Sequence, residues 1–228
     1  MEQLQLREKE IFEMLKEIKE FKFVLIGGYA VNAYALPRFS VDCDIVVKDD
    51  KETEKIEKKL IELGYSKEQI NEKNISHHGS FKRFVKKIKE NFKVSVDVLI
   101  KGVLDRKAGV VVSADWVFDN SEIKMFRGKT ITEGLKLRII NLDALFVMKF
   151  ISCRSIDIRD VFMLAPNIKD KKFVKEEILK KCNFNDNFLR IKEKINSKQF
   201  KDGLQGVYGY INDLVFEKHK KALLELEK

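Results

Sequence analysis

The sequence predicts an α/β (α+β) fold, with a mixed sheet forming the core over residues 1–135 and a helical region over residues 136–228. Two stretches indicate the sheet. Residues 23–47 contain two apolar segments separated by a glycine turn, and residues 92–100 alternate apolar and polar side chains. From Asn141 onward the apolar residues recur at helical spacing instead. No proline- or glycine-rich linker separates the two parts, so we expect the helical region to pack on the sheet.

The individual elements follow from local patterns. Leu4, Ile11 and Leu15 lie on one face of a predicted first helix, Gly64 ends a second one, and Asn141 can cap the first helix of the C-terminal region. The expected elements are a helix over 3–19, a strand pair within 22–47 with a short helix over 29–36 between its strands, a helix over 51–64, a hairpin and strand over 80–112, a β-segment over 122–134, and helices over 141–152, 156–165, 171–182, about 186–197 and about 208–226.

Two carboxylates stand on the second strand of the first pair. Side chains alternate along a strand, so Asp42 and Asp44 point to one side while Cys43 and Ile45 point to the other. Two adjacent like charges are unfavourable unless a positive group lies between them. A divalent cation is the natural partner, and oxygen ligands favour Mg²⁺ or Mn²⁺.

The turn before these carboxylates is suited to phosphate. Gly27 and Gly28 end the first strand where a helix is expected to begin, so the backbone can approach a ligand closely and offer N–H groups to an anion. A phosphate cradle followed by a carboxylate pair indicates a metal-bound nucleoside triphosphate.

A third carboxylate interrupts the alternating strand at 92–100. Val96 and Val98 share one face, whereas Asp97 lies on the other, where an unused charge on a half-buried strand would be costly. The alternative is an edge-strand aspartate that faces water. Because Asp42 and Asp44 precede it, we favour Asp97 as the third member of the site.

These motifs resemble those of the DNA polymerase beta-type nucleotidyltransferase superfamily: Gly27-Gly28, thirteen residues, then Asp42-Cys43-Asp44. Arg38 and Ser40 resemble the form found in its minimal, toxin-like branch. The resemblance implies a nucleotidyltransferase fold in which the two aspartates of the motif hold Mg²⁺ or Mn²⁺, and Arg38 and Ser40 help to bind the nucleotide.

The same resemblance implies that Asp97 completes the metal site and acts as general base for the attacking hydroxyl. The implied reaction transfers a nucleoside monophosphate from an NTP to a hydroxyl and releases pyrophosphate, with two metal ions bridged by carboxylates.

A second block resembles that of abortive-infection-type nucleotidyltransferase toxins. It contains Lys149, Arg154, Asp157 and Asp160 at the junction of two predicted helices. By resemblance Lys149 contacts the triphosphate, while Asp157 and Asp160 orient this lysine, cap the second helix or support the nucleotide. The alternative is an ordinary helical hairpin whose charges cap helix ends and face solvent.

The chain is basic, with a net charge of +9, which favours a polyanionic partner. Cations gather in a predicted hairpin over 81–93, where phenylalanines interleave with Lys82, Arg83, Lys86 and Lys87, a pattern typical of RNA or DNA surfaces. Alternatively, the phenylalanines form the core face of the hairpin and the lysines its solvated face. The adjacent histidines at positions 77 and 78 are interpreted as part of a surface loop.

Composition restricts the remaining choices. No apolar run approaches the roughly 20 residues that a membrane helix needs, and the first residues are charged, so we expect a cytoplasmic protein. Three cysteines without paired spacing do not indicate a disulfide framework or a zinc site. Two functions stay open: a metal-dependent nucleotidyltransferase acting on RNA, tRNA or a small molecule, with an antitoxin partner if it is a toxin, and a non-catalytic nucleic-acid-binding or toxin–antitoxin partner protein.

Overall fold

The computed structural model describes residues 2–69 and 80–227, so the histidine pair at 77–78 lies outside the described residues. The chain divides into two compact units. Unit 1 comprises Met1–Ala33, Pro37–Leu104 and Val111–Ile140, and unit 2 comprises Tyr34–Leu36, Asp105–Val110 and Asn141–Lys228. The sheet domain is expected over residues 1–135, whereas unit 1 ends at Ile140, the last residue of the last strand of its sheet, and leaves out residues 34–36 and 105–110.

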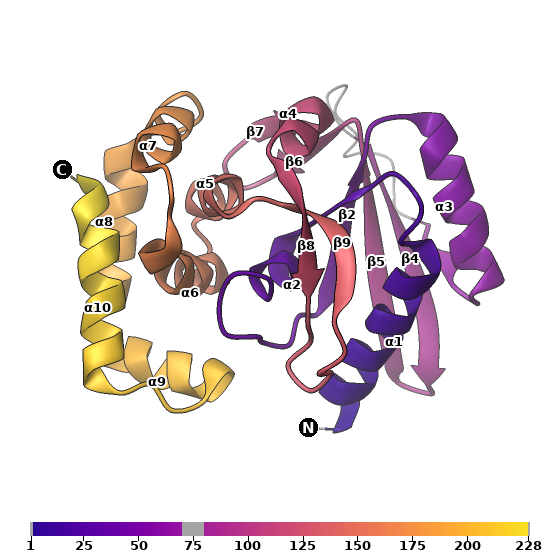
Figure 1. The fold of residues 1–228 in the computed structure, drawn as a ribbon, viewed down its shortest axis with the longest axis horizontal. Helices are drawn as coiled ribbons and strands as arrows, with labels where there is room; N and C mark the ends of the chain where they lie inside the picture. Colours follow the sequence, from indigo (N-terminus) through magenta and orange to yellow (C-terminus); the bar gives the residue numbers. More distant parts are fainter. Residues whose placement is uncertain (1, 70–79, 228) are drawn as a thin grey trace. The chain divides into compact units, whose positions relative to one another are not determined.

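Unit 1 is built on a mixed seven-stranded sheet of order β3-β4-β5-β2-β1-β9-β8, which confirms the predicted fold class (Figure 1). Its parallel pairs are β2 with β5 and β1 with β9, and the other neighbours are antiparallel. The strands are β1 (Val24–Ile26), β2 (Asp42–Val47), β3 (Ser66–Lys67), β4 (Ser80–Lys89), β5 (Phe92–Ile100), β8 (Ser121–Phe126) and β9 (Leu135–Ile140). A separate two-stranded ribbon consists of β6 (Gly102–Asp105) and β7 (Val110–Ser113).

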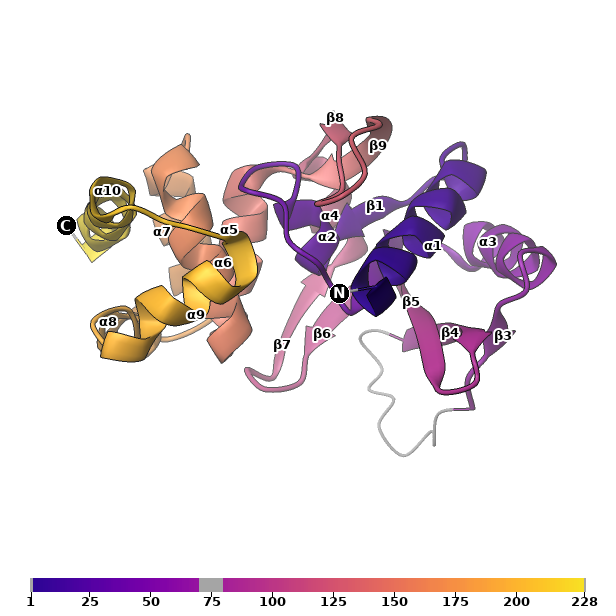
Figure 2. The same cartoon turned by 90° about the horizontal axis from the view of Figure 1, so that it is seen from below.

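Helices cover one face of this sheet. Helices α1 (Glu2–Ile18) and α3 (Asp50–Glu62) pack side by side, as both views of the ribbon show (Figures 1 and 2). Phe12 of α1 stacks on Phe126 of β8 with ring centroids 4.8 Å apart. Alternation and strand register place Ile45 and Val98 on this covered face. Their side chains are fully or almost fully buried, as is that of Phe12. The carboxylates of the predicted site therefore lie on the opposite face.

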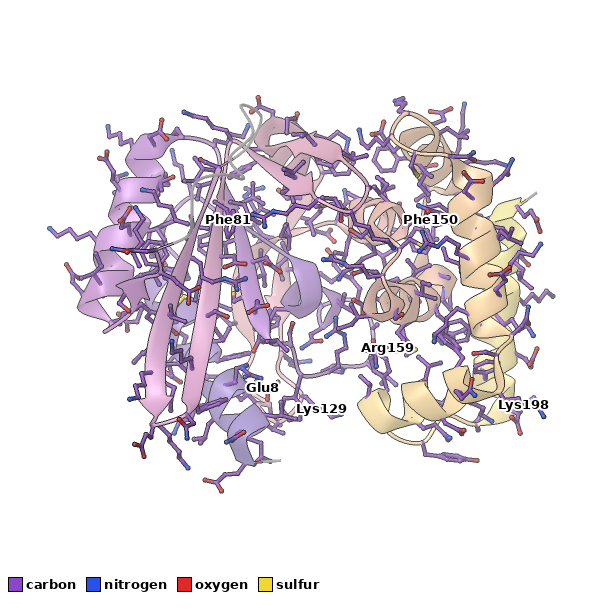
Figure 3. All side chains as sticks on the ribbon, turned by 180° about the vertical axis from the view of Figure 1, so that it is seen from behind. Glu8, Phe81, Lys129, Phe150, Arg159 and Lys198 are labelled. Atoms are coloured by element: carbon purple, nitrogen blue, oxygen red, sulfur yellow. The ribbon has the colours of Figure 1, made fainter. Side chains whose placement is uncertain are left out.

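A buried carboxylate ties α1 to the β8–β9 loop. Glu8 is 1% exposed and accepts hydrogen bonds from the backbone N–H groups of Lys129 and Thr130 and from the Thr130 hydroxyl (Figure 3). A Cβ on Gly128 would lie 2.8 Å from Cδ of Glu8, so glycine is required for this close approach. Nothing in the local sequence pattern identifies Glu8 as the residue that holds the distant loop.

Two further short helices belong to unit 1, α2 (Gly27–Val31) and α4 (Ala114–Asp119). The helix expected over 29–36 was wrong in its bounds, because α2 begins at Gly27 and ends at Val31. The side chain of Asn32 explains the early end: its Oδ1 accepts from the backbone N–H of Arg38 and its Nδ2 donates to the Arg38 carbonyl, each at 3.0 Å. These bonds close a loop where the helix would otherwise continue.

Unit 2 is helical, as predicted. Its core includes stacked and edge-on phenylalanines, among them Phe150 with Phe184 and Phe162 with Phe200, each pair at 5.2 Å. Asn141 caps the first helix by accepting from the backbone N–H of Ala144 at 2.9 Å, which confirms the predicted cap. The helices are α5 (Leu142–Ser152), α6 (Ser155–Leu164), α7 (Lys171–Leu179), α8 (Phe184–Ile195), α9 (Lys198–Tyr208) and α10 (Asp213–Leu224), with 3-10 turns at Ala165–Asn167 and Glu225–Glu227.

Several elements were not predicted from the sequence: β3, α4, α9 and β9, although the residues of β9 alternate. The helix expected over about 208–226 forms as α10 but begins later, at Asp213, because α9 precedes it and continues to Tyr208. Gly209, at φ +91°, ends α9, and Asn212 caps α10 by accepting from the backbone N–H of Val215 at 2.8 Å. Within the described residues, no helix has both the length and the apolar character needed to cross a bilayer.

Candidate active site

The three predicted carboxylates lie on neighbouring strands of unit 1. Asp44 of β2 stands directly opposite Asp97 of β5 in the parallel register, and Asp42 stands opposite Ser95. Residues paired in this way project to the same face of a sheet, and so do residues two apart on one strand. The side chains of Asp42, Asp44 and Asp97 therefore share the face opposite α1 and α3. This juxtaposition follows from the pairing of β2 with β5.

Asp97 forms a two-point ion pair with an arginine that the sequence did not link to it. Arg83 of β4 lies opposite Asp97 in the antiparallel register, and its Nε and Nη2 donate to Oδ1 and Oδ2 of Asp97, each at 2.7 Å. Asp97 is 8% exposed. Hydrogen bonding to this carboxylate raises the pKa of Arg83 further above its ordinary value. A cross-strand row thus runs from Arg83 through Asp97 to Asp44.

The other end of the cluster is also hydrogen-bonded within the protein. The Ser95 hydroxyl donates to Oδ1 of Asp42. With Asp97 held by Arg83 and Asp42 by Ser95, no three acidic, histidine or cysteine side chains in the described part of the chain are arranged to enclose a metal ion. The donor atoms nevertheless fit Mg²⁺ or Mn²⁺ in chemistry, because they are carboxylate oxygens gathered on one face of adjacent strands.

Gly27 and Gly28 are required by close contacts with site residues. Gly27 has φ +68°, and a Cβ there would overlap Oδ2 of Asp44. A Cβ on Gly28 would overlap the hydroxyl of Ser40 and lie 3.2 Å from Nη2 of Arg38. The glycine pair therefore packs against the residues that the motif places downstream of it. Their contacts with a nucleotide stay a prediction.

Arg38 and Ser40 belong to the loop that Asn32 closes. Arg38 is 3% exposed, and its Nη1 donates to the carbonyl of Phe39 at 3.0 Å. The Ser40 hydroxyl donates to the carbonyl of Asp42 at 3.4 Å. Sequence reasoning missed Asn32, which positions this loop. A polar residue inside an otherwise apolar helical segment was the available signal.

Cys43 lies between the two aspartates in sequence but on the covered face of β2. It is fully buried, as its alternation with Asp42 and Asp44 predicts. Burial, together with the neighbouring carboxylates, raises the pKa of its thiol well above the ordinary value. Cys43 is thus an apolar core residue, separated from the carboxylates by the thickness of the strand.

Unit 2 holds the second block of predicted residues as a buried ion cluster. Lys149 of α5 places its Nζ 2.9 Å from Oδ1 of Asp157 and 2.9 Å from Oδ2 of Asp160, both on α6. Nε of Arg154 lies 2.6 Å from Oδ2 of Asp157, and the Tyr208 hydroxyl donates to Oδ1 of Asp160 at 3.3 Å. The two aspartate side chains are 0% exposed.

This cluster differs from the solvated hairpin that was the alternative interpretation. Asp157 also accepts from the backbone N–H of Arg154 at 3.2 Å, so it caps α6, and its other oxygen holds Lys149. Capping of the second helix and orientation of the lysine, both proposed for Asp157, thus occur together. Contact of Lys149 and Asp160 with a nucleotide stays a prediction.

The basic hairpin over 81–93 forms as β4 and β5, but most of its cations are engaged. Lys82 pairs with Glu57 at 2.6 Å, Lys86 pairs with Glu10 at 2.7 Å, and Arg83 holds Asp97. Of the hairpin aromatics, Phe84 and Phe92 are buried in the core, whereas Phe81 is half-buried (Figure 3). Lys87 is exposed and lies opposite Lys93. A nucleic-acid surface on this hairpin stays a prediction.

No family model and no curated protein matches the sequence. Among solved structures, MenT4, a nucleotidyltransferase toxin from Mycobacterium tuberculosis, matches with a TM-score of 0.60 and 15% identity over 99% of this chain and 84% of that chain. The chain has the nucleotidyltransferase fold.

Two Helicobacter pylori structures agree. A candidate nucleotidyltransferase matches with a TM-score of 0.51 and 19% identity over 100% of this chain and 94% of that one, and JHP933 matches with a TM-score of 0.50 and 18% identity over 100% and 91%. The resemblance inferred from Gly27-Gly28 and Asp42-Cys43-Asp44 is therefore confirmed at the level of the nucleotidyltransferase fold.

Proposed function

We propose that this protein transfers a nucleoside monophosphate from an NTP to a hydroxyl group, with RNA, tRNA or a small molecule as acceptor. The observation that carries the proposal is the register of β2 and β5, which brings Asp42, Asp44 and Asp97 onto one sheet face in a chain with the nucleotidyltransferase fold. In the proposed reaction the acceptor oxygen bonds to the α-phosphorus, the bond from that phosphorus to the bridging oxygen breaks, and pyrophosphate leaves.

Mg²⁺ or Mn²⁺ would be held by the carboxylates of Asp42, Asp44 and Asp97. Bound there, the cation supplies charge neutralisation for the triphosphate and the leaving pyrophosphate. Gly27 keeps the space beside Oδ2 of Asp44 clear, since any Cβ at that position would fill it. Lys149, oriented by Asp157 and Asp160, is proposed to contact the triphosphate.

Asp97 is the proposed acceptor of the hydroxyl proton, and its pairing with Arg83 sets a condition on this role. Both oxygens of Asp97 accept from a guanidinium, a group that stays protonated in proteins. An incoming hydroxyl would therefore have to compete with the guanidinium for either oxygen of Asp97. We therefore expect the Arg83–Asp97 pair to open when substrate binds.

The same pair favours the alternative function, which the basic hairpin also supports. A stable Arg83–Asp97 pair would neutralise the third carboxylate permanently, as suits a non-catalytic nucleic-acid-binding or toxin–antitoxin partner protein that keeps the fold. The two functions differ in their dependence on the carboxylates. The enzyme needs Asp44 to be ionised and correctly placed, whereas a binding protein does not.

The deciding experiment is a transfer assay with each α-³²P-labelled NTP, Mg²⁺ or Mn²⁺, and total cellular RNA or candidate small-molecule acceptors. Asp44→Asn removes one carboxylate of the cluster, and Asp202→Asn removes an exposed carboxylate in unit 2 as the matched control. The proposal expects wild type and Asp202→Asn to transfer label and Asp44→Asn to lose at least about 100-fold in rate, the scale of losing one charge-stabilising group. Equal transfer by all three proteins, or none by wild type with any acceptor, would overturn it.

A role as a toxin is a further part of the proposal, supported by the fold shared with MenT4, a nucleotidyltransferase toxin. Growth after induced expression tests it. Arrest by wild type but not by Asp44→Asn would tie toxicity to the carboxylates and justify a search for an antitoxin protein. Normal growth with soluble, active protein would refute the toxin role while leaving the enzymatic proposal intact.

A further inference from the structure

A groove of about 450 Å³ lies at the β8–β9 end of the sheet in unit 1, far in sequence from the carboxylate motif. Its floor is apolar and largely aromatic. Phe23 and Leu137 are buried beneath it, and Phe21 and Phe118 are half-buried. The ammonium of Lys48 lies over the Phe118 ring, 5.0 Å from its centroid, so one face of that ring is already covered within the protein. Ile123 of the edge strand β8 is 51% exposed at its margin. The floor therefore offers flat apolar surface to a ligand.

The rim of the groove is cationic: Lys19, Lys22, Lys136 and Arg138 line it, and no acidic residue does. All four are exposed, and none has a carboxylate within 4.0 Å among residues 2–69 and 80–227. The side chain of Arg138 makes a neutral hydrogen bond, from Nη1 to the Ser121 hydroxyl at 3.2 Å. The positive charge of this rim is therefore not neutralised by the protein itself.

The hairpin at the other end of the sheet differs in this respect. Its Lys82 and Lys86 have their charges balanced by Glu57 and Glu10 at 2.6 and 2.7 Å. A phosphate group would have to displace those carboxylates, whereas on the groove rim it would meet cations without acidic partners. A polyanion therefore meets more unneutralised positive charge at the groove than at the hairpin.

Strand register also relates the groove to the carboxylates. Leu25 pairs with Ile45 and with Ile139, so these three project to the face covered by helices. Arg138, next to Ile139 on β9, therefore projects to the same face as Asp44. Between β9 and β2 lies only β1, so the two strands are about 10 Å apart, or two inter-strand spacings. Lys136 shares this face with Arg138, whereas Leu137 of the floor projects with Ile139 to the covered face, so only the rim residues of β9 share a face with the carboxylates.

We propose that this groove binds single-stranded nucleic acid, with phosphates on Lys19, Lys22, Lys136 and Arg138 and bases on the aromatic floor. Cations that follow the backbone, together with rings on which bases stack, are the two parts of a single-strand site. A duplex would present phosphates but keep its bases stacked away from the rings of Phe21 and Phe118. Binding of a single strand in the groove does not depend on the proposed function. Only the role of that strand as the acceptor rests on it.

The test measures binding without catalysis. A fluorescein-labelled single-stranded RNA of mixed sequence is titrated with protein in EDTA, without NTP, and anisotropy is recorded at several salt concentrations. Lys136→Gln/Arg138→Gln is compared with Lys82→Gln/Lys86→Gln, which removes the same number of charges from the hairpin. A third variant, Phe118→Leu, keeps an apolar side chain but removes the ring.

The groove double variant should lose at least about tenfold in affinity, and the slope of log affinity against log salt should fall by about 1.4, or 0.7 for each lost phosphate contact. Phe118→Leu should lose about fivefold or more, the lower end of a lost base stack. The hairpin variant should change affinity by less than about twofold. Thermal melting of each protein checks that it is folded, and Lys19→Gln/Lys22→Gln supplies a second groove variant.

The inference would be overturned by no RNA binding by wild type, by an equal or larger loss in the hairpin variant, or by displacement of the RNA by polyglutamate at equal charge concentration. The last would identify an acidic peptide as the occupant. Binding through the groove without nucleotide transfer would uphold this inference while refuting the proposed function. A groove variant that keeps its RNA affinity and still transfers nucleotide to RNA would refute this inference while upholding the proposed function.

Discussion

Replacement of Lys149 by methionine should destabilise the protein strongly, because it leaves buried negative charge without its partner. The side chain of Lys149 is 10% exposed and those of Asp157 and Asp160 are 0% exposed. Removing one partner of a buried ion pair costs roughly 3–5 kcal/mol. Asp157 keeps Arg154 at 2.6 Å, so the loss falls mainly on Asp160 and we expect about 3 kcal/mol.

Urea unfolding followed by far-UV circular dichroism measures this free energy. Lys172→Met is the matched control, because the side chain of Lys172 is 86% exposed and its Nζ lies as far as 4.0 Å from Oε1 of Glu176. Its replacement should therefore lower the free energy of unfolding by less than about 0.5 kcal/mol. In the double variant Lys149→Met/Asp160→Asn the uncompensated charge is gone, and about 1 kcal/mol or more should be recovered. A Lys149→Met protein as stable as the control, or a double variant less stable than the single one, would refute this reasoning.

Gly27→Ala should cost about 1–3 kcal/mol of unfolding free energy from backbone strain and lower Mn²⁺ affinity in calorimetry, because its Cβ would displace the carboxylate of Asp44. Gly109→Ala is matched to it, with φ +67° and nothing within 4 Å, so it should show the strain alone; equal Mn²⁺ binding by both variants would contradict the assignment. Burial lowers the pKa of His219 below its ordinary 6.5, while its Nδ1 lies 3.0 Å from the carbonyl of Phe162. The unfolded chain therefore binds the proton more readily, so stability should be full above about pH 6.5 and decline below it. The melting temperature should fall between about pH 7.5 and pH 5.5 by more in wild type than in His219→Gln, and parallel declines would argue against His219 as the source.

Much of both units is predictable from local sequence because the signals are local. The period of two along β2 places Asp42 and Asp44 together and Cys43 in the core, whatever the strand pairs with. The cap at Asn141 is equally local, since its side chain bonds a backbone group three residues on. Such features depend on backbone geometry over a few residues.

Other features needed the tertiary structure because they join residues far apart in the chain. Whether Asp97 faces Asp44 or water depends on which strand lies beside β5, and the pairing with β2 decides it. The partner of Arg83 follows from the β4–β5 register, so a residue that reads as one cation among several on a basic hairpin instead holds Asp97. Composition likewise shows an excess of positive charge but not which cations are neutralised.

The sequence by itself determined the alternation of side chains, the capped helices and the spacing of the glycine and aspartate motif. Only the tertiary structure decided the order of strands, the insertion of β9 beside β1, and the ion pairs that leave Arg138 without an acidic partner among the described residues. The physical reason is that strand order and long-range charge pairing are set by the burial of the whole sheet, a free energy to which no short segment contributes alone.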